Sequence, residues 1–259
     1  MLQKYDLNRI HEFIPFNICL LGARRSGKSV ASYKLTEFLD PKFDLVLSFL
    51  GTKNCNKELC DFIGHRYDPR LNFVEFKPKV LSTLLAQQEA LIQAGTPREV
   101  LVVFDDVFAS NTRHVEILTQ LFIRGRHYRI SIINSAVCFT TVQKNCRRCL
   151  DIMFLFSSVC KSDNQILSSE YIHGSVSTAQ YALQNLPPYT ALVIETKRNQ
   201  RLFEFRFPLG TDLDEYGNVE VQGEIEDPED SSESQESENI LLRNDTLEAP
   251  PKNGTAVEA

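Results

Sequence analysis

The sequence has no apolar run long enough to cross a membrane. A membrane helix needs about 18 or more consecutive apolar residues, and no run in the 259 residues approaches that length. The first residues, MLQKYDLNRIHEF, also lack the apolar segment of a secretory signal. We therefore expect neither a membrane span nor export by a secretory signal.

Cysteine is present, but not in the pattern of a secreted disulfide framework. The chain has seven cysteines, an odd number at irregular spacing, so we expect reduced thiols in a cytosol-like compartment. Cys146 and Cys149 form a C-x-x-C pair. A structural zinc site would need a second pair at suitable spacing, and a redox role would need a thioredoxin-like unit. We therefore interpret the pair as a chance occurrence.

Positive charge is scarce at one end of the chain only. Residues 211–259 carry 15 carboxylates and two cations, whereas residues 1–210 carry 19 carboxylates and 26 cations. The stretch 223–238 is acidic, rich in serine and nearly free of apolar side chains, so we expect a disordered tail. We predict a folded domain over 1–210 and an acidic tail over 211–259. The basic domain is compatible with nucleic-acid binding, although an ordinary solvated surface explains it equally well.

Short apolar runs alternate with helical patterns over the first 210 residues. Helical spacing predicts helices over 27–39, where Val30, Tyr33, Leu35 and Phe38 recur, and over 80–94 and 114–123. Apolar runs predict strands over 16–21, 45–49, 73–76, 100–104, 130–133, 152–156, 191–194 and 202–207. This alternation predicts an α/β fold with a mainly parallel sheet and helices on both faces. Residues 197–200 are expected to form a hairpin at the sheet edge.

One segment matches a phosphate-binding loop. The pattern G-x-x-x-x-G-K-S follows a predicted strand and opens a predicted helix, as the mechanism of such a loop requires. Backbone N–H groups and the helix dipole would hold the phosphates of a nucleoside triphosphate, most readily ATP. The alternative is a glycine turn capped by serine. The predicted nucleotide-binding residues are Gly22, Ala23, Arg24, Arg25, Ser26, Gly27, Lys28, Ser29 and Val30.

Within this loop, two side chains have distinct expected roles. Lys28 should reach the β- and γ-phosphates, and the hydroxyl of Ser29 should bind Mg²⁺.

A second signal is the apolar run 100–104, which is followed by Asp105 and Asp106. These carboxylates would emerge where α/β sheets bind ligands. We predict that Asp105 holds Mg²⁺ through water and that Asp106 deprotonates the attacking water; the alternative is an acidic loop.

A basic segment, RGRHYR at 124–129, leads into the run at 130–133. Arg124, Arg126 or Arg129 could act as an arginine finger on a neighbouring subunit's nucleotide. They could instead contact DNA phosphates, and a solvated loop remains the alternative. His127 is expected to pack or hydrogen-bond beside the nucleotide site.

Together, GARRSGKS, VLVVFDDV, RGRHYRISIIN and FTTVQKNCRR resemble the viral DNA-packaging ATPases of the FtsK–HerA superfamily, the small kind found in poxviruses and other large DNA viruses. The resemblance covers roughly 16–160. The chain departs from the family where a sensor glutamine is usual, because Val137 aligns there. Asn134, Ser135 or Gln143 could replace that glutamine.

The resemblance implies a RecA/FtsK–HerA-like P-loop domain that hydrolyses ATP with Mg²⁺. It also implies a homo-oligomeric ring that surrounds double-stranded DNA, contacts its phosphates without sequence preference and pumps it into a preformed capsid. A capsid or portal-like viral protein would then be a partner. The host cytoplasm or a viral factory would be the location, with the virion as a further place.

Two other functions fit parts of the sequence. A nucleotide or small-molecule kinase would need an arginine-rich lid, and the basic loop is a poor lid because it leads directly into a strand. A nucleotide-dependent assembly scaffold without turnover would explain the absent sensor glutamine, but the intact pair of Asp105 and Asp106 argues against it.

Overall fold

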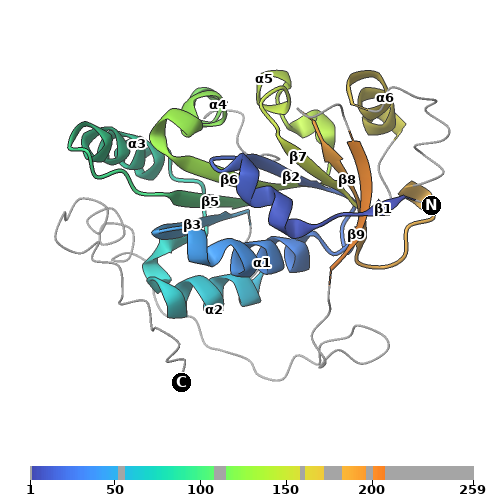
Figure 1. Ribbon diagram of the computed structural model, residues 1–259, viewed down its shortest axis with the longest axis horizontal. Coiled ribbons are helices and arrows are strands. Elements are labelled where there is room, and N and C mark those ends of the chain that lie inside the picture. Colours follow the sequence, from blue (N-terminus) through green and yellow to red (C-terminus); the bar gives the residue numbers. More distant parts are fainter. Residues whose placement is uncertain are drawn as a thin grey trace, which may run out of the picture.

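The computed structural model describes residues 2–51, 56–107, 115–157, 161–171, 183–196 and 201–207. Within these residues, the expected α/β fold with a mainly parallel sheet is confirmed, and nine strands form one sheet (Figure 1). The strands are β1 (Gln3–Lys4), β2 (Asn17–Leu21), β3 (Leu45–Leu50), β4 (Asn72–Phe73), β5 (Val100–Asp105), β6 (Ile130–Ala136), β7 (Ile152–Leu155), β8 (Thr190–Glu195) and β9 (Arg201–Arg206).

The strand order places the predicted phosphate-loop strand in the middle of the sheet. The order is β1-β9-β8-β7-β2-β6-β5-β3-β4, and within it only β8 runs against its neighbours. The carboxyl ends of the other strands therefore share one side of the sheet, called here the carboxyl edge, and their starts share the amino edge. Strand β6 lies between β2 and β5.

Helices cover both faces of the sheet, as expected. Helices α1 and α2 lie on one face, and α3 to α6 lie on the other (Figure 1). None of the described helices has the length and apolar character that a bilayer crossing requires. The helices are α1 (Lys28–Leu39), α2 (Lys57–Arg66), α3 (Pro78–Gln93), α4 (Val115–Arg124), α5 (Lys144–Arg147) and α6 (Lys161–Glu170), with short 3-10 helices that include η5 (Gly125–Tyr128) and η6 (Phe139–Thr141).

Several expected details differ in the structure. Helices α2, α5 and α6 were not predicted, because α5 is only one turn long and the other two have a narrow apolar face. In α2, only Leu59 and Ile63 are buried. The expected strand at 73–76 is the two-residue β4. The last two strands pair antiparallel, but β1 pairs with β9 and so forms the sheet edge. Residues 197–200 and the tail at 211–259 lie outside the described residues.

The buried face of α1 also differs from the expected one. Val30, Tyr33 and Phe38 are only partly buried, and the helix packs on the sheet through Ala31, Leu35 and Leu39 together with two hydroxyl residues, Ser32 and Thr36. Thr36 donates its hydroxyl hydrogen bond to the Ser32 carbonyl at 2.8 Å. This internal bond lets a polar residue occupy the core face, where apolar spacing alone does not reveal it.

Candidate functional site

The phosphate loop lies at the carboxyl edge, between the end of β2 and the start of α1. The Gly22 N–H donates to the Ala136 carbonyl of β6 at 3.3 Å, which ties the loop to the neighbouring strand. Gly27 directly precedes the helix and has φ +99°, a left-handed conformation that favours glycine. The backbone thus has the strand–loop–helix geometry that the sequence pattern predicted.

The side chain of Lys28 lies over this loop. Its ammonium donates to the carbonyls of Gly22 and Ala23, both at 3.0 Å, and only 6% of the residue is exposed. Burial lowers the pKa of Lys28, although the carboxylates of Asp106 and Asp105 oppose this shift. The lysine is therefore a partly desolvated cation that is held close to both carboxylates.

The other predicted loop residues have different exposures. Arg24 is exposed, but its charge acts on both Lys28 and Asp106, so it lies at the same site. Arg25 is exposed with φ +63°, and Ser29 is also exposed. The remaining members, Ala23, Ser26 and Val30, are partly buried. Contact of each with a nucleotide stays a prediction.

Asp105 and Asp106 lie at the same carboxyl edge, at the end of β5. Asp105 is 3% exposed, whereas Asp106 is exposed and has φ +53°. The Asp106 N–H donates to the Ser135 carbonyl at 3.2 Å, which fixes this turn against β6. Partial burial raises the pKa of Asp106, while Lys28 lowers it. The Asp105 carboxylate is thus buried, and the Asp106 carboxylate is only partly buried and lies near Lys28.

Two residues that the sequence analysis did not identify hold this pair. The Asn56 side-chain amide donates to the Asp105 carboxylate at 3.3 Å. The Gly51 N–H donates to the Asp105 carbonyl at 2.8 Å, and a Cβ at Gly51 would lie 2.8 Å from the Asp106 carbonyl oxygen. Gly51 directly follows β3, which pairs with β5. A glycine directly after a strand that neighbours β5 is the sequence signal that could have identified Gly51 as part of the site.

Of the residues that could replace the sensor glutamine, Ser135 is the best placed. It pairs in register with Asp105 of β5 and Leu20 of β2. Neighbouring strand residues point to opposite faces, and the side chain of Asn134 faces the buried Cys19 thiol. Gln143 accepts a hydrogen bond from the Thr119 hydroxyl of α4 at 3.0 Å, so it is engaged elsewhere.

Two buried hydroxyls near these groups lack partners. Within the described part of the chain, the hydroxyls of Ser26 and Ser135 have no hydrogen-bond partner. Such orphaned groups are costly unless a ligand or water satisfies them. Mg²⁺ commonly uses one or two protein oxygens together with phosphate oxygens. Ser29 and the Asp105 carboxylate fit this donor set, and no cluster of three metal-binding side chains occurs among the described residues.

The basic segment lies at the opposite, amino edge. Arg126 forms an ion pair with Asp151, whose side chain is fully buried and also accepts from the Asn17 N–H at 2.8 Å. Arg129 pairs with Glu99 at 2.7 Å. His127 is exposed at this edge, so its expected place beside the nucleotide was wrong. Within one subunit, therefore, these arginines do not belong to the phosphate site.

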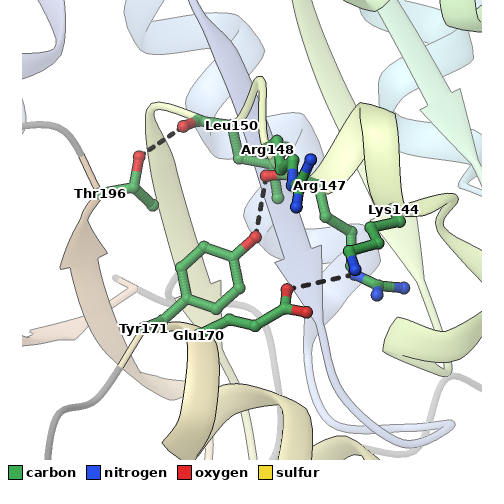
Figure 2. A pocket seen from close by; sticks show the side chains of 7 residues that line it. All are labelled: Lys144, Arg147, Arg148, Leu150, Glu170, Tyr171 and Thr196. Carbon is green, nitrogen blue, oxygen red and sulfur yellow. Dashed lines mark hydrogen bonds and ion pairs between the residues drawn. The ribbon is translucent and has the colours of Figure 1, made fainter.

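A hollow of about 370 Å³ opens between α5 and α6 (Figure 2). The Tyr171 hydroxyl donates to the Arg147 carbonyl at 2.8 Å, and Glu170 lies 3.7 Å from the Arg147 guanidinium. Arg147 also donates to the Val142 carbonyl at 2.8 Å. These polar groups bond to one another and so connect α5 to the end of α6. It is lined by Lys144, Arg147, Arg148, Leu150, Glu170, Tyr171 and Thr196.

The C-x-x-C pair flanks Arg147 and Arg148, which line this hollow. Cys146 is buried in the core, its sulfur lies 3.9 Å from the Thr119 hydroxyl, and burial raises the pKa of its thiol to about 11. Cys149 is partly buried. A buried thiol with a raised pKa is a poor nucleophile, so Cys146 acts as a packing residue.

Comparison with known proteins identifies the family. The model of the family described as Poxvirus A32 protein matches residues 3–186, well over half of the chain. The chain belongs to the poxvirus A32 protein family. No curated protein matches the sequence significantly.

Solved structures show the same fold as this A32 family member. The DNA-packaging ATPase B204 from Sulfolobus Turreted Icosahedral Virus has a TM-score of 0.56 and 13% identity, over 76% of this chain and all of that chain. The genome packaging NTPase B204 from Sulfolobus turreted icosahedral virus 2, in complex with AMPPCP, has a TM-score of 0.56 and 15% identity, over 75% and 98%. The cytoplasmic domain of the Type VII Secretion ATPase EccC from Thermomonospora curvata has a TM-score of 0.52 and 13% identity, over 80% and 25%.

Proposed function

We propose that this A32 family member is an ATP-hydrolysing motor that moves double-stranded viral DNA into a preformed capsid. The observation that carries the proposal is the convergence of Lys28, Asp105 and Asp106 at one edge of the sheet, from two strands with a third between them. The solved structures of the same fold include proteins described as packaging ATPases, and one of them holds AMPPCP. These likenesses support the same activity here.

In this mechanism, the chain's own residues bind ATP and accept one proton from the attacking water. The loop N–H groups and Lys28 bind the phosphates, and Lys28 stabilises the charge that develops during transfer. Asp106 accepts a proton from the attacking water as its oxygen bonds to the γ-phosphorus. The bond from that phosphorus to the β–γ bridging oxygen breaks, and ADP leaves. Bound Mg²⁺, held by Ser29 and through water by Asp105, would neutralise charge on the β- and γ-phosphates.

A DNA-stimulated ATPase assay tests the proposal. We expect turnover to require Mg²⁺ and to rise when duplex DNA of any sequence is added. We expect the stimulation to weaken as salt rises, because phosphate contacts release counterions. Turnover that depends instead on a small acceptor molecule would indicate a kinase. ATP binding with no turnover in any condition would indicate an assembly scaffold.

The proposal includes a homo-oligomeric ring in which a neighbour's arginine completes each site. Arg124 suits this role better than Arg126, because Arg126 is paired with Asp151, whereas Arg124 makes no polar contact within the described residues. Arg124 lies on a groove of about 600 Å³ between α4 and α5. Its neighbour Ile123, which also lines this groove, is 48% exposed. An exposed apolar residue beside a free cation suits contact with another subunit.

Subunit mixing tests the role of Arg124. The Arg124→Ala variant should fold, bind ATP and assemble, but hydrolyse ATP at least about 100-fold more slowly. Mixed with Asp106→Asn subunits, it should recover part of the basal turnover, since some interfaces would join an intact arginine to an intact carboxylate. No recovery in rings shown by mass to be mixed would contradict a role in trans. Loss of DNA stimulation alone would make Arg124 a DNA contact.

The remaining parts of the proposal concern partners and place. A capsid or portal-like viral protein would hold the ring, and the host cytoplasm or a viral factory, with the virion as a further place, would be its location. The charge difference between residues 1–210 and the acidic residues 211–259 supports a domain that contacts DNA and a separate tail.

A further inference from the structure

An aromatic side chain lies against the phosphate loop from a distant part of the chain. Strand β8 runs against its neighbours, so its first residue, Thr190, lies at the carboxyl edge. Tyr189 directly precedes it. A Cβ at Gly27 would lie 2.9 Å from the Cδ1 atom of the Tyr189 ring and 3.6 Å from its Cα. The ring therefore touches the loop at the residue that precedes α1.

The backbone holds Tyr189 in an unusual conformation. Its φ is +58°, in the left-handed region that bulky residues seldom adopt. Two prolines, Pro187 and Pro188, precede it, and the Thr190 N–H donates to the Pro187 carbonyl at 3.2 Å. The Phe207 N–H donates to the Tyr189 carbonyl at 3.0 Å. A strained aromatic residue that is fixed from both sides and lies at a ligand site indicates a functional constraint.

The position of the carboxylates determines where the rest of a nucleotide extends. Asp105 and Asp106 follow β5, so the γ-phosphate end of a triphosphate in the loop points toward β6 and β5. The nucleoside then leaves the loop on the opposite side, toward β7 and β8. Tyr189 is on that side, because β8 is separated from β2 only by β7.

The ring of Tyr189 has surface available for a ligand. Tyr189 is partly exposed, whereas Phe156 and Phe207, the aromatic residues nearest this end of β7 and β9, are fully buried and stack on each other with centroids 5.9 Å apart. Among the described residues, the Tyr189 hydroxyl has no hydrogen-bond partner. A flat ring with a free polar tip is suited to stacking on a nucleobase.

We propose that Tyr189 is the stacking platform for the base of the bound nucleoside triphosphate. The inference rests on the proposed nucleotide-binding function. Stacking is tolerant of base identity, since every base has a π-face. Tyr189 would therefore contribute affinity for nucleosides in general, and it would contribute nothing to binding of the triphosphate group itself.

Calorimetric titration with two ligands separates these contributions. ATP and inorganic tripolyphosphate, each with Mg²⁺, would be titrated into the full chain, Tyr189→Leu and the matched control Tyr189→Phe. We expect Tyr189→Leu to bind ATP about tenfold more weakly, with tripolyphosphate binding unchanged. Tyr189→Phe should match the unmodified chain with both ligands.

Other outcomes have distinct meanings. Equal losses for ATP and tripolyphosphate in Tyr189→Leu would show that Tyr189 only supports the loop, and unchanged ATP binding would also overturn the proposal. If Tyr189→Leu does not fold, as judged by thermal melting, Tyr189→Gly provides the test, because glycine adopts the positive φ without strain. Failure of the unmodified chain to bind either ligand would contradict the proposed function instead.

Discussion

The Lys28→Ala variant is expected to hydrolyse no ATP above background and to bind ATP about 100-fold more weakly. Lys28 is almost fully buried, and burial lowers its pKa, so its charge is poorly screened by water. A charge-assisted hydrogen bond in such a place contributes up to about 3 kcal/mol, which corresponds to about two orders of magnitude in affinity. Turnover falls further, because the developing phosphate charge loses its main cation.

Lys34→Ala is the matched control for this experiment. Lys34 lies in the same helix, but it forms a surface ion pair with Glu37 at 3.0 Å, away from the loop. Pairs of this kind contribute little to stability, so turnover and thermal melting should stay near those of the unmodified chain. Radioactive phosphate release and ATP titration provide the two measurements. Near-normal turnover in Lys28→Ala would refute the phosphate-loop assignment.

Sequence patterns predicted the parts of this protein that depend on local periodicity and on sheet geometry. The apolar runs gave β2 and β5, and a parallel sheet places the carboxyl ends of its strands on one edge. From these two facts, Asp105 was expected at the ligand-binding edge of the sheet, and in the structure its carboxylate opposes the lowering of the Lys28 pKa by burial. No side-chain contact had to be known for this expectation.

The residues that the sequence did not reveal depend on contacts between distant segments. Asn56 reaches Asp105 across 49 residues, and Tyr189, which directly precedes the reversed strand β8, touches Gly27. Neither has a periodic pattern or a motif around it. The ion pair of Arg126 was missed for a related reason: its partner, Asp151, is 25 residues away and is buried at the amino edge. The pairing of two isolated charges cannot be predicted from spacing alone.

The Asp106→Asn variant is expected to bind ATP normally and to turn it over 10²- to 10⁴-fold more slowly, roughly the range for a lost general base. Asparagine has nearly the same shape as aspartate and tolerates a positive φ, so the turn at +53° should persist. The backbone bond from residue 106 to the Ser135 carbonyl should persist as well. What is lost is the group that accepts a proton from water.

Asp105→Asn provides the comparison that assigns the two roles. Asp105 is buried and accepts from Asn56, so its replacement removes a negative charge where Mg²⁺ is expected to bind. We expect this variant to need a much higher Mg²⁺ concentration for half-maximal turnover, whereas the Mg²⁺ requirement of Asp106→Asn should stay unchanged. Single-turnover phosphate release, measured across a Mg²⁺ titration, separates the two effects. If Asp106→Asn shows the shifted Mg²⁺ requirement and Asp105→Asn the loss that Mg²⁺ cannot restore, the two assignments are reversed.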